Sequence, residues 1–293
     1  MSNDILEIEK VQALANIKVE PPQHIGLEEI NKHIKESIRS EFYFKYPDSD
    51  FDLAWENQKE ISCFLALENA YDLGYTVNHE THYVMRLIAT WHIEKALKSL
   101  KFDTDKDPNL MKDIETANIG TAGRIAKIWA GNGLDSENIR EYGDGRWTKC
   151  PRLASFPTNN NTQGKPVTVV IDNPGIGSVC SHHFLPFSIQ NQQNSKIVIS
   201  YIPQNRLLGL SKIGRFVEWC LNRPSLQEEV TQLIFTKIKE IAETDNVYVG
   251  LLNFVHSCET TRGAKQYSTT TTEEYSGVFD SPEMRASVLD VAR

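Results

Sequence analysis

The chain has 293 residues, of which 40% are hydrophobic and 24% charged, and its formal net charge is −8. This is the composition of a soluble globular protein that can bury a full core, as one large domain or a domain with an extension. The acidic balance excludes the general basic surface of nucleic-acid-binding proteins, so an anionic ligand would need a local cluster of cations.

The sequence also predicts the compartment. The first ten residues are polar and acidic, so a signal peptide is not expected, and no run approaches the roughly 20 apolar residues of a membrane span. The cysteine count is odd, at five. A protein of the reducing cytoplasm, with free or metal-bound thiols, is therefore expected.

The N-terminal part predicts helices. Residues 1–82 form a polar, mostly helical extension of unknown role, with apolar residues at helical spacing over 27–39 and 57–71. Amphipathic helices are expected at 83–100 and 121–130, the second with Thr121 as its N-cap. We therefore place the boundary of the main domain, 83–293, at the first of these two helices.

The C-terminal half changes to a pattern of strands and helices. Its order is three strands, two helices and two strands, which predicts an α+β fold with an antiparallel sheet covered on one face by two helices. The strands are expected at residues 167–171, 178–187, 196–203, 247–255 and 265–279, and the helices at 210–221 and 225–243.

Cysteine and histidine side chains suggest a metal site. Cys180 and His183 lie three positions apart toward the end of one expected strand, and Cys258 follows the end of another. Two thiolates and an imidazole make three protein ligands, and catalytic zinc sites keep the fourth position for water or substrate. The alternative is that these cysteines are small apolar core residues.

Two more histidines accompany these candidate ligands. His182 precedes His183, and His256 lies two positions before Cys258, on the same face of an extended segment. An imidazole that does not bind the metal can transfer protons near neutral pH. The pattern thus predicts a zinc hydrolase with two acid/base histidines.

Cations gather at two predicted helix starts. A helix N-terminus with basic side chains one turn apart is a ready phosphate site, although each cation taken alone is typical of a solvated surface. The candidate residues are Ser211, Lys212 and Arg215 on one helix, Arg124 and Lys127 on another, and Arg262 shortly after Cys258.

Gln227, Glu228 and Glu229 lie in the first turns of the second long helix. Acidic residues there complement the helix dipole. Alternatively, one carboxylate accepts two hydrogen bonds from the edge of a guanine. The residues alone do not choose between these roles.

These motifs together resemble the GTP cyclohydrolase I family, from about residue 83 to residue 279, with the N-terminal extension left unexplained. The matching stretches are residues 123–129, 180–187, 201–218, 226–228, 256–264 and 268–272. The resemblance implies the tunnelling fold, assembled as a barrel-like toroid, typically a homodecamer with active sites at subunit interfaces. It also implies conversion of GTP and water to 7,8-dihydroneopterin triphosphate and formate, for folate, biopterin or 7-deazaguanine synthesis.

The resemblance also implies a role for each candidate residue. Zinc falls on Cys180, His183 and Cys258, where it would activate water for attack on C8 of the purine. Proton transfer falls on His182 and His256, with Ser211 near the ribose. The remaining positions bind substrate: Glu228 with Gln227 for the guanine, and Lys212, Arg215, Arg262, Arg124 and Lys127 for the triphosphate.

Some positions depart from the family pattern. Ser181 stands where the family usually has Glu, and Glu229 and Glu259 stand where it has Arg and apolar residues. These carboxylates would weaken a nearby triphosphate by like-charge repulsion. They keep open a same-fold enzyme for another purine or pterin. A catalytically silent binding subunit is the third alternative. The joint presence of His182, His256, Lys212 and Glu228 argues against it.

Overall fold

The computed structural model describes residues 27–60, 77–113, 118–131, 150–158, 164–173, 176–190, 194–261 and 268–293. The chain divides into two compact units, residues 1–37 and 38–293. The described part of the first unit is the beginning of helix α2 (Leu27–Lys45), where the Ser37 hydroxyl donates to the His33 carbonyl at 2.7 Å. Among the described residues, no helix is long and apolar enough to cross a membrane.

Three helices follow in the second unit. They are α3 (Phe51–Glu60), α5 (His79–Ser99) and α6 (Gly120–Ala130), and both α3 and α6 pack against α5. The expected helices at 83–100 and 121–130 are thus confirmed, with earlier starts. Of the helix expected at 57–71, the described residues 57–60 belong to α3, and 61–71 lie outside the described residues.

The predicted cap of α6 is wrong. The helix begins at Gly120 after Ile119, so Thr121 lies inside it, and its hydroxyl donates to the Asn109 carbonyl at 3.4 Å. Gly120 has a φ of 66°, and a Cβ there would lie 2.9 Å from the Leu110 carbonyl oxygen. The entry into α6 therefore depends on the conformational freedom of glycine rather than on a side-chain cap.

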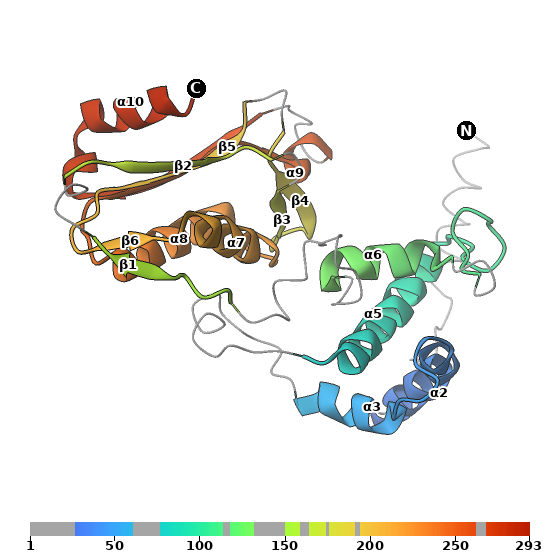
Figure 1. Ribbon diagram of the computed structural model, residues 1–293. Helices are drawn as coiled ribbons and strands as arrows, with labels where there is room; N and C mark the ends of the chain where they lie inside the picture. The colour runs from blue at the N-terminus through green and yellow to red at the C-terminus, as the bar shows by residue number, and fades with distance from the viewer. Residues whose placement is uncertain are drawn as a thin grey trace, which may run out of the picture. The chain divides into compact units, whose positions relative to one another are not determined.

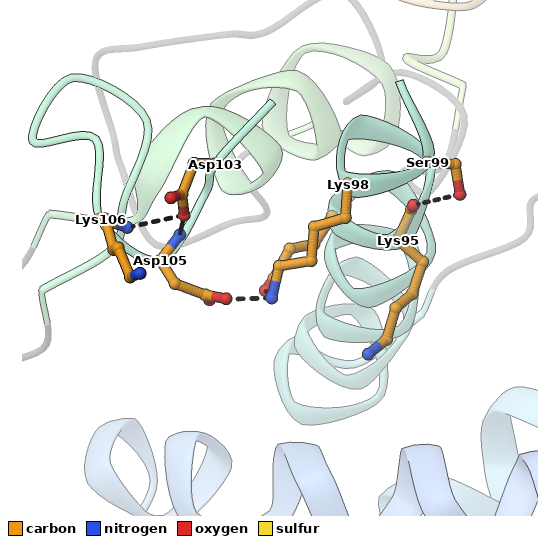
Figure 2. A network of polar contacts seen from close by, with 7 residues as sticks. Lys95, Lys98, Ser99, Asp103, Asp105 and Lys106 are labelled. Carbon is orange, nitrogen blue, oxygen red and sulfur yellow. Dashed lines mark hydrogen bonds and ion pairs between the residues drawn. The ribbon is translucent and has the colours of Figure 1, made fainter. Parts of the chain in front are cut away.

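The acidic loop after α5 is tied back to that helix (Figure 2). The Lys98 ammonium pairs with Asp105 at 2.8 Å and with Glu94 at 2.9 Å. The Asp103 carboxylate accepts the backbone N–H groups of Asp105 at 3.2 Å and Lys106 at 3.1 Å. The hydrogen bond to Asp105 is the main cause that raises the pKa of Lys98 above its usual range.

An antiparallel sheet forms the centre of the C-terminal half. Its strands are β2 (Val167–Ile171), β3 (Gly177–Cys180), β4 (Leu185–Ser188), β5 (Lys196–Tyr201), β7 (Val247–His256) and β8 (Thr270–Ser276). The order is β2-β5-β7-β4-β3, and β8 pairs with β7. A separate antiparallel pair joins β1 (Ser155–Pro157) to β6 (Arg206–Leu208).

Two expected strands are corrected. The segment 178–187 is a hairpin of β3 and β4, because residues 181–184 form a turn in which Phe184 has a φ of 53°. Of the strand expected at 265–279, β8 covers 270–276, and 265–267 lie outside the described residues. The hairpin places Cys180 at the end of β3 and both adjacent histidines in its turn.

Helices cover both faces of this sheet (Figure 1). On one face lie α7 (Leu210–Leu221) and α8 (Gln227–Ala242), in a core with fully buried residues such as Phe216, Ile234 and Val249. On the other face, the 3₁₀ turn η3 (Gly277–Asp280) and α10 (Pro282–Val291) pack over Val198 and Tyr248.

The two helices predicted for one face are confirmed, and the covering of the second face was not predicted. Every residue of β5 is buried, as expected for a strand with both faces covered. The described fold is therefore an α+β fold whose sheet lies between two layers of helix.

Candidate functional site

The tip of the β3–β4 hairpin carries the first group of predicted residues. Cys180 is buried, and its carbonyl accepts the N–H groups of His183 at 3.3 Å and Phe184 at 2.8 Å, which closes the turn. His182 and His183 are exposed, with ring centroids 6.2 Å apart and planes at 76°. The turn thus presents two imidazoles next to a buried thiol.

The second group lies at the end of β7. Register pairing sets Phe187 of β4 opposite His256, and the short helix α9 (Ser257–Thr261), which contains Cys258, packs against β4. Burial is the main cause that raises the pKa of the Cys258 thiol, and the neighbouring Cys180 thiol raises it further. The structure therefore brings together two cysteines that are far apart in the sequence.

The predicted third zinc ligand is not gathered with them. Within the described part of the chain, no three side chains of His, Cys, Asp or Glu stand close enough to hold a metal ion. The donor chemistry nevertheless suits zinc, because two neighbouring sulfurs and an imidazole one turn from Cys180 are its usual ligand types. Zinc on Cys180, His183 and Cys258 stays a prediction.

His256 is held firmly by its neighbours. Its ring stacks on Phe187 with centroids 4.8 Å apart and planes at 4°, and its Nε2 lies 2.7 Å from Gln227 Oε1. Burial lowers the pKa of His256, and the charges of Glu259 and Glu228 partly offset this. The ring is therefore held by Phe187 and Gln227, and His256 itself lies two residues before Cys258 in the chain.

Gln227 and Glu228, the pair predicted to bind guanine, lie at the start of α8 in different environments. Gln227 is 1% exposed, and its Nε2 donates to the carbonyls of Leu251 and Thr270, each at 3.2 Å, and to Thr272 Oγ1 at 3.0 Å. Glu228 is exposed to solvent. Only the carboxylate of this pair is accessible to a ligand.

The predicted phosphate-binding residues lie on two helices. In the first turns of α7, Ser211 and Arg215 are exposed and Lys212 is half-buried. Among the described contacts, none joins these three to the thiols or to His256. Arg262 lies outside the described residues.

The other basic pair belongs to α6. The Arg124 guanidinium donates to the Asn118 side chain at 3.1 Å and to the Asn109 carbonyl at 2.9 Å, so it holds the preceding loop. Lys127 lies one turn further on. The same helix reaches the histidine turn, because the Trp129 indole N–H donates to the Phe184 carbonyl at 3.1 Å.

The residues that depart from the family pattern have hydrogen-bond partners close to them in the fold. Ser181 donates its N–H to the Ser225 carbonyl at 3.1 Å, beside a parallel bridge between Cys180 and Ser225. The Glu229 carboxylate accepts the Leu226 N–H at 3.2 Å and so caps α8, and the Glu259 carboxylate accepts the Ser268 hydroxyl. Both carboxylates therefore have structural roles of their own.

Sequence reasoning missed the residues that support His256. Phe187 and Thr272 lie in the two matching stretches 180–187 and 268–272, where no role was assigned to them. Thr231, whose hydroxyl lies 2.6 Å from that of Thr272, has no distinguishing signal in the sequence. Phe187 lies on the strand that pairs with the end of β7. Because side chains alternate between the two faces of a strand, Phe187 is the residue that the strand pattern could have placed beside this site.

The chain is similar to proteins of known family. The family model described as GTP cyclohydrolase I matches residues 141–293. GTP cyclohydrolase 1 of Blochmanniella pennsylvanica is 35% identical over 167 residues, 56% of this chain and 66% of that protein. GTP cyclohydrolase 1 of an Enterobacter species is 31% identical over 202 residues, 68% and 77% of the two chains. That of Flavobacterium johnsoniae is 31% identical over 173 residues, 58% and 69%. The match spans just under two thirds of the first of these relatives.

Proposed function

Because the chain belongs to the GTP cyclohydrolase I family, we propose that it hydrolyses GTP to 7,8-dihydroneopterin triphosphate and formate. One observation carries the proposal: β7 leads from His256 into α9, where the Cys258 thiol neighbours the Cys180 thiol. A proton-transfer group thus lies two residues from one of two neighbouring thiols that suit zinc, and a metal-assisted hydrolysis needs both kinds of group.

Substrate binding falls to exposed charges at the starts of two helices. The Glu228 carboxylate has two acceptor oxygens for the N1–H and 2-amino groups of guanine. The N-terminus of α7, with Lys212 and Arg215, suits the triphosphate. Arg262, Arg124 and Lys127 are proposed to add to this binding, the last two from α6.

Proton transfer falls to the two histidines that are not proposed as ligands. Burial lowers the pKa of His256, so its ring is neutral at pH 7 and ready to accept a proton. His182, exposed in the hairpin turn, is proposed to protonate the purine ring at N7 so that it opens. Ser211 is assigned to the ribose, whose rearrangement closes the pterin.

Cys180, His183 and Cys258 are proposed to hold zinc. When bound, zinc supplies an acidified water for attack on C8 of the purine. Of these three residues, Cys180 is buried, Cys258 is half-buried, and His183 is exposed in the hairpin turn.

Assembly and place in metabolism extend the proposal. Among the described strands, β2, β3 and β8 each pair with one strand only, so the sheet has open edges that favour association with another sheet. The form proposed for this association is the tunnelling fold, as a homodecamer with sites at subunit interfaces. The product serves folate, biopterin or 7-deazaguanine synthesis, and a cytoplasmic location suits all three.

The test is formate release from GTP by zinc-loaded protein, with the pterin followed by its near-ultraviolet absorbance. We expect turnover in the wild type and a loss of about 100-fold or more in His182→Ala, the range of a general acid. His92→Ala is the matched control, because His92 is exposed on α5, and it should keep full activity.

Two results would contradict the proposal. Turnover of another purine nucleotide in place of GTP would indicate a same-fold enzyme of different specificity. Binding of GTP with no formate from zinc-loaded protein would indicate a silent binding subunit.

A further inference from the structure

We propose that Gln227 is a positioning residue that holds His256 with its proton on Nε2, so that Nδ1 is the nitrogen that exchanges protons with the substrate. The inference rests on the proposed function and deepens it. It also removes Gln227 from the guanine-binding set and leaves that role to Glu228.

The orientation of the Gln227 amide is decided by its partners. The carbonyl oxygens of Leu251 and Thr270, both 3.2 Å away, can only accept hydrogen bonds. The amide nitrogen must therefore face them. The amide oxygen then faces His256. The hydrogen-bond partners, and not the shape of the side chain, distinguish the oxygen of the amide from its nitrogen.

A chain of hydroxyl groups agrees with this orientation. The Thr231 hydroxyl donates to the Gln227 backbone carbonyl at 2.8 Å, which uses its one proton. Thr272, 2.6 Å away, must then donate to Thr231 and accept from the Gln227 amide nitrogen at 3.0 Å. The two hydroxyl protons of this buried network therefore have one consistent direction, and the two amide protons of Gln227 are shared among three acceptors.

The tautomer of His256 follows. Gln227 Oε1 is an acceptor, so His256 Nε2, 2.7 Å away, must be the donor. In the neutral ring the lone pair then lies on Nδ1. A proton accepted or delivered by His256 during turnover therefore passes through Nδ1.

The surroundings keep this arrangement rigid and close the Gln227 amide off from the substrate. The network joins α8, β7 and β8, and Phe187 stacks on the ring at 4.8 Å. Gln227 is 1% exposed and each of its amide atoms has a partner inside the protein. A group held in this way supports a neighbour better than it binds a ligand.

The first experiment reads the tautomer directly in the zinc-loaded full chain labelled with ¹⁵N-histidine. The His256 signals are those that disappear in His256→Asn, and spectra are recorded at about pH 8, above the usual histidine range. A ring protonated on Nε2 supports the proposal, and a ring protonated on Nδ1 overturns it.

The second experiment separates positioning from guanine binding. In Gln227→Met we expect loss of the single tautomer and a fall in kcat of about 10- to 100-fold, with the KM for GTP within about two-fold. A large rise in KM with unchanged kcat would overturn the proposal. Gln232→Met, an exposed site on the same helix, is the control and should change neither.

Failure of this inference can be told from failure of the proposed function. The tautomer is read without turnover, so an inactive wild type protonated on Nε2 would overturn the function while supporting the positioning of His256. If Gln227→Met does not fold, the wild-type tautomer decides by itself.

Discussion

At the scale of residues, the described cysteines occupy two kinds of environment. Cys150 and Cys220 belong to the core beneath α7, and burial raises the pKa of the Cys150 thiol to about 12. Cys180 and Cys258 instead neighbour each other, and Cys258 follows His256 by two residues. A thiol must lose its proton to bind a metal, so the neighbouring pair, next to a histidine turn, is the better zinc site.

A cysteine substitution tests this assignment. Cys258→Ser should lower zinc affinity by about 100-fold or more, since even the loss of a residue that only supports a ligand costs about 10- to 100-fold. Zinc retained during competition with a chelator is the measurement. Cys150→Ser is the matched control and should keep its zinc. Equal zinc loss in both variants would contradict the assignment of Cys258 as a ligand.

At the scale of elements, short-range contacts decide where each helix begins. α8 begins with the Glu229 carboxylate on the Leu226 N–H, and α5 begins with the Asn78 side chain accepting the Thr81 N–H at 2.8 Å. Each bond satisfies a donor that the helix itself leaves free. These caps set the register in which the following residues face the core.

The cap of α5 predicts a measurable loss of stability. Asn78→Ala should lower the free energy of unfolding by about 1 kcal/mol, because the Thr81 N–H loses its partner. The midpoint of urea unfolding is the readout. Ser99→Ala is the control: that hydroxyl only bonds back to the Lys95 carbonyl at the other end of α5 (Figure 2), and little change is expected. An equal shift in both variants would show that the cap adds nothing.

At the scale of the whole molecule, the sheet has two cores. One lies under α7 and α8, and the other lies under the C-terminal segment, where Phe279 is fully buried against Tyr248 at 6.3 Å between ring centroids. Because β5 and β7 contribute to both cores, the C-terminal segment supports the strand that ends at His256.

Removal of one aromatic ring tests the second core. Phe279→Ala should cost about 3–5 kcal/mol of unfolding free energy, through lost burial and the cavity that remains. Val278→Ala, on the adjacent 40% exposed side chain, should stay within about 0.5 kcal/mol. If both variants unfold at the same denaturant concentration, the second core does not contribute.

The amino-acid sequence by itself determined most of the elements. The bounds of β2 and α7 agree with their expected ranges, because apolar periodicity is set by neighbours along the chain. The same periodicity hid the turn at 181–184, which interrupts an otherwise continuous strand pattern without a glycine or proline. The helix at 282–291 was not predicted.

The environments of the site residues depend on tertiary contacts between segments that are distant in the sequence. Gln227 and Glu228 are adjacent in sequence, but a helix turns by about 100° per residue, so one side chain enters the core and the other faces solvent. The partners of Gln227 come from β7 and β8, more than twenty residues further along the chain. Local propensity carries no information on such pairs, because they form only when distant segments pack together.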